Sequence, residues 1–290
     1  MIESGVLDDI LRYGPAFLLV AARALAMIET APLLSSDAIP QAAKLSLAGF
    51  AAFAVFPTAG DWYTGAGGAA LSAGIADGAF AGTGLEPFGL GFLLLLAGEA
   101  IIGLITGFFL TIIFSAFSTA GQFFSLQMGF GASETFDPLS QIENPLLGQY
   151  LNLVAMLVFL SVGGFRELFL GGFWRSVQTL NIVALVTGRE TVIGMIGAGL
   201  SRLFLDAIVI SMPILGTLFL TSLATGLVSK AAPQINILSE GFPISITVAF
   251  LLIFAALPFM TEAFARVVNS GFDSIESLYT RIGVQITGVP

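Results

Sequence analysis

The stretch FLLLLAGEAIIGLITGFFLTIIFSAFSTAGQFFSLQ, residues 92–127, decides the fold class of this 290-residue chain. It runs for 36 residues without proline and contains Glu99 as its single charged residue. A continuous helix over this stretch would be roughly 54 Å long, because an α-helix rises about 1.5 Å per residue. The hydrocarbon core of a bilayer is only about 30 Å thick. The sequence therefore predicts an apolar helix that is too long for one simple transmembrane span.

The composition of the whole chain is that of a membrane protein. Hydrophobic residues make up 56% of it, charged residues make up 10%, and the mean hydropathy is +0.96. Soluble chains carry roughly 25% charged residues. We therefore predict an all-α integral membrane fold with about six hydrophobic segments. They lie at residues 10–34, 45–60 (short for a span), 87–133, 144–165, 207–229 and 241–261.

The residue types that are missing from the chain exclude most enzyme classes. With no Cys and no His, thiol nucleophiles, most zinc sites and Ser/His or Cys/His catalysis are excluded. The net charge is −9 and no cluster of Lys and Arg occurs, which argues against a nucleic-acid partner. We expect no enzymatic activity, no metal and no cofactor.

The Lys and Arg residues do not alternate between loops as the positive-inside rule requires. Residues 58–86 and 114–145 lack both types, although the strongest hydrophobic segment lies between them. Lys230 and Arg266 flank the last hydrophobic segment on both sides. Either the topological signals are weak, or the helical hairpins do not cross a bilayer in the usual way.

Two connecting segments have distinct compositions. Residues 60–91 hold ten of the 34 glycines, three acids and no base, which predicts a flexible, exposed connector. Residues 164–206 contain four arginines among apolar positions, which favours one or two amphipathic helices over a span.

Arg23 and Glu99 are ionisable residues inside hydrophobic segments, where charge is unfavourable and often functional. One interpretation makes Glu99 a proton or substrate carboxylate of a secondary transporter that works with Arg23. The other makes the two residues a structural pair. Gly103 and Gly107 have the small-xxx-small spacing that lets helices approach closely, and we interpret them as packing residues. An intramembrane hydrolase is disfavoured, because no motif forms an aspartyl pair.

The segment 127–145, QMGFGASETFDPLSQIENP, breaks the helix directly after the long apolar run. Irregular backbone at membrane depth is tolerated where it is buried in protein or lines a water-filled cavity. The segment suits a constriction or plug, and an ordinary surface loop with two aromatic residues remains the alternative. The candidate gate residues are Met128, Gly129, Phe130, Gly131, Phe136, Asp137, Pro138, Asn144 and Pro145.

The segment 229–243, SKAAPQINILSEGFP, joins two uncharged runs and predicts the turn of a helical hairpin. Turn chemistry explains it without a functional role. Its candidate contact residues are Lys230, Pro233, Gln234, Asn236, Glu240, Gly241 and Pro243.

Several short motifs, taken in order, resemble the FliR-type subunit of the flagellar type III secretion export gate. They cover about residues 16–268, and they are specific in combination. The motifs are RALAM at 23–27, APLLS at 31–35, AIP at 38–40, GQFFSLQMG at 121–129, FDP at 136–138, NP at 144–145, APQINI at 232–237 and GFPI at 241–244.

The resemblance implies a subunit of a helical export channel in the bacterial inner membrane, multi-pass and part of the flagellar basal body. One copy assembles with FliP-type and FliQ-type subunits into a cone of long bent hairpins that conducts unfolded flagellar proteins. FlhB-type and FlhA-type components and membrane lipid are the further implied partners. By position, residues 130–143 form a loop that helps close the pore, and residues 233–243 lie at the cytoplasmic entrance.

The resemblance also implies a division of the chain. A FliP-like helical hairpin part covers residues 1–228, including the loop 127–145 and the connector 60–91. A FliQ-like hairpin covers residues 207–268, and residues 269–290 form a C-terminal tail. The connector is longer than is usual in this family, and the tail matches no family feature.

Overall fold

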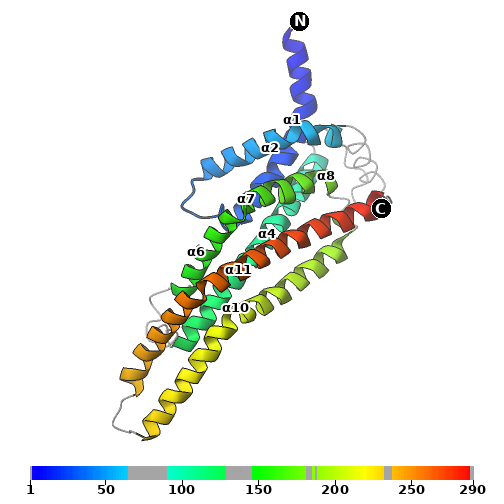
Figure 1. The fold of residues 1–290 in the computed structure, drawn as a ribbon. Helices are drawn as coiled ribbons and strands as arrows, with labels where there is room; N and C mark the ends of the chain where they lie inside the picture. The colour runs from blue at the N-terminus through cyan, green and yellow to red at the C-terminus, as the bar shows by residue number, and fades with distance from the viewer. Residues whose placement is uncertain are drawn as a thin grey trace. The chain divides into compact units, whose positions relative to one another are not determined.

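The computed structural model describes residues 2–64, 90–128, 146–180, 185–186, 188–231 and 237–287. In these ranges the chain forms helices joined by turns and contains no strand, so the all-α prediction is confirmed. Figure 1 shows α1 (Ile2–Thr30), α2 (Gln41–Thr64), α4 (Leu90–Met128), α6 (Leu146–Ser161), α7 (Gly164–Arg166), the π-helix η1 (Glu167–Trp174), α8 (Arg175–Thr179), α10 (Arg189–Ala231) and α11 (Ile237–Thr287).

Four helices in the described ranges are long and apolar enough to cross a membrane. A fifth span results if α6 and the helical stretch Gly164–Thr179 are counted as one broken span. The sixth predicted segment, residues 45–60, corresponds to Gln41–Pro57, which is apolar and helical but shorter than a span, as the sequence indicated.

The overlong helix predicted from residues 92–127 is present as α4, which runs for 39 residues without a break. At about 1.5 Å per residue its length is about 58 Å. The prediction of amphipathic helices over residues 164–206 agrees with the helical stretch 164–179, in which Leu168, Phe173 and Val177 are buried and Arg166 and Arg175 are exposed. It was wrong from Arg189 onward, because these residues begin the 43-residue helix α10, which is long and apolar enough to cross a membrane.

The chain divides into two compact units, each assembled from distant segments. The first unit contains Met1–Thr111, Phe165–Ala198 and Gly271–Pro290. Within it, α2 packs against α1 and runs across it (Figure 1). The buried side of α1 is formed by Val20, Ala24 and Met27, all fully buried. The family-based division at residues 228 and 268 rests on sequence resemblance and stays a prediction.

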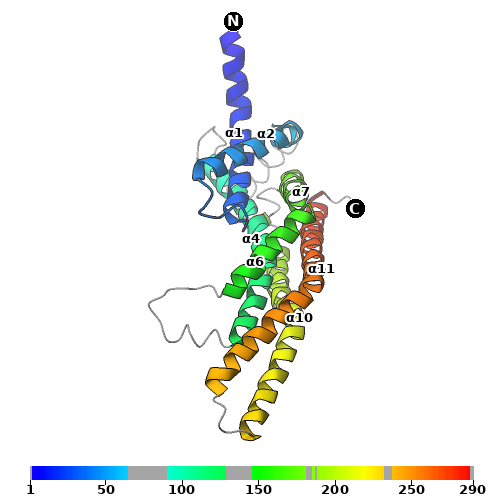
Figure 2. The ribbon, with the colours of Figure 1, turned by 60° about the vertical axis from the view of Figure 1, so that its left-hand side comes forward.

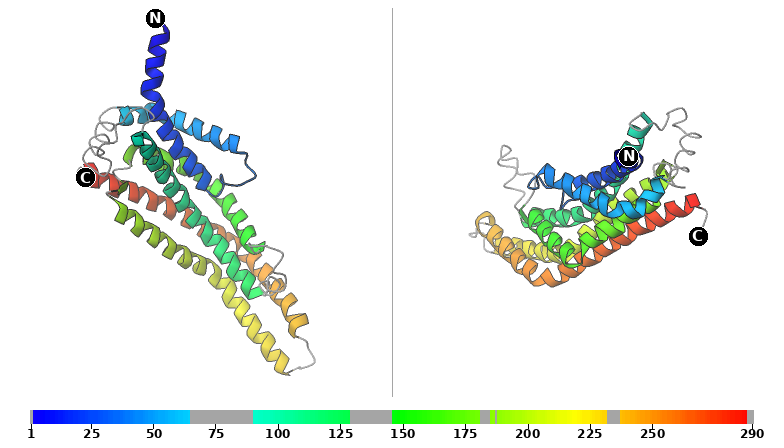
Figure 3. Two further views of the ribbon diagram at one scale, coloured as in Figure 1. Left: turned by 180° about the vertical axis from the view of Figure 1, so that it is seen from behind. Right: turned by 90° about the horizontal axis from the view of Figure 1, so that it is seen from above.

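The second unit contains Ile112–Gly164 and Gly199–Ser270. In it, the part of α10 after Ala198 and the part of α11 up to Ser270 lie side by side as a helical hairpin (Figures 2 and 3). Aromatic side chains fill its core: the ring centroids of Phe117 and Phe264 are 3.8 Å apart, and those of Phe114 and Phe159 are 5.5 Å apart. Burial of large aromatic side chains dominates the energetics of such cores.

Glycines set the closest helix contacts in each unit. In the second unit, a Cβ on Gly121 of α4 would lie 2.5 Å from the Cα of Gly148 in α6. In the first unit, a Cβ on Gly107 would lie 2.7 Å from the carbonyl oxygen of Met27 and would collide with the hydroxyl of Thr30. The interpretation of Gly103 and Gly107 as packing residues is confirmed by these contacts.

Candidate functional site

A buried ion pair between Arg23 of α1 and Glu99 of α4 lies in the first unit. The side chain of Arg23 is 0% exposed and that of Glu99 is 2% exposed. The Nε of Arg23 donates a hydrogen bond of 2.6 Å to Glu99 Oε2, and its Nη2 forms an ion pair with the same oxygen. The structure thus brings together the two ionisable residues that the sequence identified.

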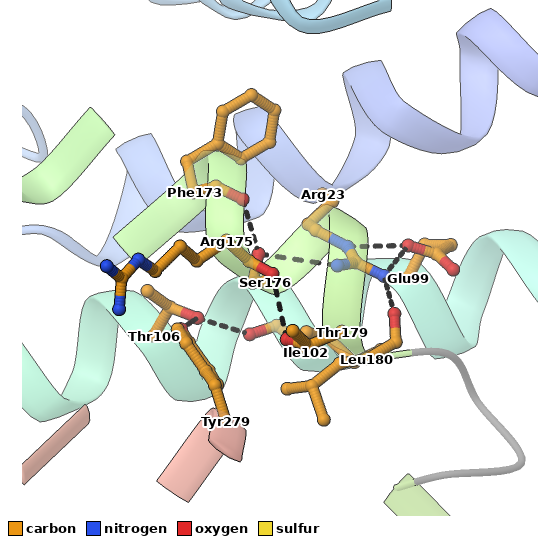
Figure 4. Close-up of polar contacts among 10 residues, drawn as sticks. All are labelled: Arg23, Glu99, Ile102, Thr106, Phe173, Arg175, Ser176, Thr179, Leu180 and Tyr279. Atoms are coloured by element: carbon orange, nitrogen blue, oxygen red, sulfur yellow. Dashed lines mark hydrogen bonds and ion pairs between the residues drawn. The ribbon is translucent and has the colours of Figure 1, made fainter. Parts of the chain in front are cut away.

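The same arginine also binds α8 and the residue that follows it. Arg23 Nη1 donates to Ser176 Oγ at 3.3 Å, and Nη2 donates to the carbonyl oxygen of Leu180 at 2.8 Å. Ser176 in turn donates to the carbonyl oxygen of Phe173 at 2.7 Å. Figure 4 shows the guanidinium between Ser176 on one side and Glu99 on the other, with the carbonyl oxygen of Leu180 below it. One side chain therefore links three helical elements.

Local sequence explains how the two charged residues reach one another. Gly103 follows Glu99 by four residues, so both lie on the same face of α4. A Cβ on Gly103 would collide with the carbonyl oxygen of Arg23. Since glycine has no side chain, the backbones of α1 and α4 approach closely at this point, and the guanidinium lies within reach of the carboxylate.

A second polar contact lies on the same face of α4, about two turns after Glu99. Thr106 donates to the carbonyl oxygen of Ile102 at 2.9 Å, and its oxygen lies 2.9 Å from the hydroxyl of Tyr279 in α11. Because the single hydroxyl proton of Thr106 is used by Ile102, Tyr279 is the donor to Thr106. A cavity of about 10 Å³ borders Thr106 and Tyr279, which is the size of one water molecule at most.

The cluster has the chemistry of a structural linkage. Each nitrogen of the guanidinium has a hydrogen-bond partner, and a buried charge requires this because an unpaired charge in low dielectric is strongly unfavourable. Removing one partner of a buried pair typically costs 3–5 kcal/mol, although the intact pair adds little net stability over apolar residues. Among the described residues no group of three or more Asp or Glu side chains is arranged to hold a metal ion.

We predict that Ser176→Ala destabilises the first unit by roughly 1–2 kcal/mol, because the charged guanidinium of Arg23 loses a hydroxyl acceptor in a buried site. The measurement is the thermal unfolding midpoint of the purified chain in detergent. Ser277→Ala is the matched control, since Ser277 is exposed and its hydroxyl bonds only to its own helix. Equal midpoints for the two variants would contradict the prediction.

Most of the other predicted site residues are not placed by the structure. Residues 129–145 lie outside the described ranges, and with them Gly129, Phe130, Gly131, Phe136, Asp137, Pro138, Asn144 and Pro145. Met128 is described and is the buried last residue of α4. No contact in the structure tests the predicted gate.

Of the candidate entrance residues, too, the structure describes only some. Pro233, Gln234 and Asn236 lie outside the described ranges, and the side chain of Glu240 is not described. Lys230 is exposed in the last turn of α10. The predicted turn is shorter than expected, because α11 begins at Ile237 and includes Glu240, Gly241 and Pro243.

The site contains residues that sequence reasoning missed. Ser176 and Leu180 lie 153 and 157 positions from Arg23, and Tyr279 lies 173 positions from Thr106. A further ion pair joins the buried Lys44 of α2 to the partly exposed Glu29 of α1 at 3.1 Å. A charged residue inside the short apolar run at 45–60 would have indicated such an ion pair. Lys44 lies one residue before that run, so the sequence did not mark it.

Comparison with known proteins gives a consistent result. The model of the family described as bacterial export proteins, family 1, matches residues 15–271. The chain is 34% identical to the flagellar biosynthetic protein FliR of Borreliella burgdorferi over 197 residues, which are 67% of this chain and 73% of that protein. It is 28% identical to FliR of Bacillus subtilis over 96% of this chain and 100% of that protein. It is 29% identical to FliR of Escherichia coli over 88% of this chain and 91% of that protein.

Proposed function

The chain belongs to the bacterial export proteins, family 1, as a FliR-type member, and from this premise we propose that it is a channel subunit of the flagellar type III export apparatus. Its proposed role is to form and gate part of the pore through which unfolded flagellar proteins cross the inner membrane. The carrying observation is the match to FliR proteins over almost the whole chain, together with four helices of membrane-spanning length.

The proposed partners are FliP-type and FliQ-type subunits, with FlhB-type and FlhA-type components nearby. The exposed apolar surface of α10 and α11 supports an obligate assembly. On α10 the large side chains of Phe204, Phe219 and Leu220 are more than half exposed, and on α11 Phe254 is 80% exposed. Exposed apolar patches of this kind mark interaction surfaces. The same helices carry the exposed Arg202 and Arg266, which favours protein over hydrocarbon as their neighbour.

We propose that residues 130–143 form the plug of this pore and that the junction of α10 and α11 lies at its cytoplasmic entrance. Support comes from the sequence: the segment after Met128 is rich in glycine, proline and aromatic residues immediately after a 39-residue apolar helix. Met128 is the last residue of α4, so the helix ends where the glycine and proline residues begin.

The second role considered from the sequence, a secondary transporter that uses Glu99, is less well supported. A transport carboxylate exchanges its proton or ligand with water. Glu99 is instead buried, and its Oε2 is held by the guanidinium of Arg23. The geometry therefore supports a structural linkage in the first unit of an otherwise passive channel subunit.

The proposed function is tested by deleting residues 130–143 in cells that also produce the FliP-type and FliQ-type partners. We expect the shortened chain to copurify with both partners and the membrane to leak ions, because the plug is absent while the helices remain. The measurements are copurification on a tag and the decay of an ion gradient. The intact chain is the control.

Each contrary outcome overturns a distinct part of the proposal. A complex that assembles and stays tight to ions would show that residues 130–143 are not the plug. Failure of the intact chain to copurify with either partner would overturn the role as an export-channel subunit.

A further inference from the structure

Helix α2 carries an apolar face that no other described element covers. Its apolar part, Gln41–Pro57, contains Lys44 as its single charged residue. At about 1.5 Å per residue this part is about 25 Å long, shorter than the hydrocarbon core of about 30 Å. The helix is therefore too short to cross a bilayer along the normal, yet it is apolar enough to enter one.

The inward face of α2 follows helical spacing and packs against α1. Ala48, Ala52 and Val55 are buried on it, and Lys44 shares the same face four residues before Ala48. Phe56 packs beside it, with its ring 5.8 Å from the ring of Phe17 in an edge-to-face arrangement. The contact between α1 and α2 is thus ordinary apolar packing, apart from the lysine.

Lys44 directs its charge into the protein. Its Nζ lies 3.1 Å from Glu29 Oε2 and donates to the carbonyl oxygen of Ser35 at 3.0 Å. Its side chain is only 3% exposed. Lysines on the surface of soluble proteins extend into solvent, because burying an ammonium group without partners is unfavourable. Here the charge is neutralised internally, and the outward face of α2 carries none.

The outward face consists of large apolar side chains. Phe50 is 77% exposed, Phe53 is 71% exposed, and Leu45 and Leu47 are exposed beside them. The hydroxyl of Ser46 donates to the carbonyl oxygen of Ala42 at 2.7 Å, so it needs no outside partner. In hydrocarbon every polar group has to be satisfied internally, and Lys44 and Ser46 both meet this requirement.

Other exposed faces of the chain differ in this respect. The exposed parts of α10 and α11 contain the surface pairs Arg202–Asp206 and Glu262–Arg266 among their apolar residues. Protein interfaces combine an apolar centre with a polar rim. The α2 face has no such rim between residues 42 and 57.

The sequence that follows the apolar part of α2 is typical of a membrane–water interface. The helix continues through Asp61, Trp62 and Tyr63, and Trp and Tyr are enriched where membrane meets water.

We propose that the outward face of α2, centred on Phe50 and Phe53, is embedded in the acyl chains of the lipid bilayer. The helix enters one leaflet as a partial insertion and does not cross the membrane. The partner of this face is lipid hydrocarbon, in contrast to the export subunits proposed for α10 and α11. This inference goes beyond the proposed function, since a channel subunit could have α2 in water, lipid or protein.

The absence of cysteine from the chain allows a direct test. Single variants Phe50→Cys, Phe53→Cys and Leu47→Cys receive a nitroxide spin label in membranes that contain the full chain with its FliP-type and FliQ-type partners. Collision of the label with dissolved oxygen, which concentrates in hydrocarbon, is compared with collision with a water-soluble nickel chelate. We expect high oxygen access and low nickel access at all three positions.

Two control positions calibrate the measurement. Ser36→Cys, in the exposed turn before α2, is expected to show high nickel access, and Ala52→Cys, buried against α1, is expected to show low access to both reagents. High nickel access at positions 50 and 53 would place the face in water and overturn the proposal. Low access to both reagents would show that another protein covers the face, which also overturns it. Copurification with the FliP-type and FliQ-type partners is measured on the same membranes. If the chain copurifies but its α2 face is not in lipid, only this inference fails, whereas loss of copurification of the intact chain counts against the proposed function.

Discussion

The variant Arg23→Leu is expected to lose about 3–5 kcal/mol of stability, because it leaves the carboxylate of Glu99 buried without its cation. It also removes the donors to Ser176 and to the carbonyl oxygen of Leu180, so α8 loses its link to α1. Native proteins have a total stability of only about 5–15 kcal/mol. We therefore expect little or no assembled protein, measured as the yield of chain that copurifies with its partners.

The double variant Arg23→Met with Glu99→Leu provides the decisive comparison. Apolar replacement of both partners of a buried ion pair is often close to neutral, so the double variant is expected to recover a large part of the lost yield. Recovery remains partial because the carbonyl oxygen of Leu180 still lacks its donor. The exposed pair gives a control: Arg266→Leu is expected to have an effect below about 1 kcal/mol. Normal assembly of Arg23→Leu would contradict the linking role of the pair.

The second large effect is expected from Gly121→Ala, which destabilises the second unit by about 1–3 kcal/mol or more. The new Cβ would lie 2.5 Å from the Cα of Gly148, 2.6 Å from its nitrogen and 2.7 Å from the carbonyl oxygen of Leu147. All three atoms belong to the backbone, so no rotation of a side chain relieves the collision and α4 has to move away from α6. The measurement is the thermal unfolding midpoint in detergent.

Gly216→Ala in α10 is the matched control for this variant. A Cβ at Gly216 would meet nothing within 4 Å, and alanine favours helix over glycine by about 1 kcal/mol. The same substitution is therefore expected to raise stability at position 216 and to lower it at position 121. Similar shifts in the same direction at both positions would show that the contact between α4 and α6 is looser than the structure indicates.

The sequence was sufficient to predict the fold class and the main helices. Apolar runs locate α1, α4, α10 and α11, because each run reaches or exceeds the roughly 20 residues that cross a bilayer. Helix ends were less predictable. Arg189 and Arg202 suggested a separate amphipathic element, but long arginine side chains are tolerated within a long helix when their charged ends remain exposed.

The candidate site was only half predictable. Charge within an apolar run marks Arg23 and Glu99 individually, since burial of charge is rare enough to be noticed in a sequence. Ser176 and Leu180 could not be found, because a single serine and a backbone carbonyl have no sequence signature. Their contact with Arg23 depends on the three-dimensional path of the chain over more than 150 residues. The same holds for the hydroxyl contact of Thr106 with Tyr279.

The way the chain is divided between its two units sets the order in which they are completed during synthesis. The second unit ends at Ser270, whereas the first unit requires Gly271–Pro290 as well as the N-terminal segment. The ion pair between Arg23 and Glu99 needs only early residues, but Tyr279 and Glu276, which contact Thr106 and Arg175, are made after the whole second unit. Contacts between residues so distant in sequence form late, because loop closure has to precede them. The first unit is therefore completed after the second. A chain that ended at residue 270 would contain all residues of the second unit, whereas the first unit would lack Gly271–Pro290.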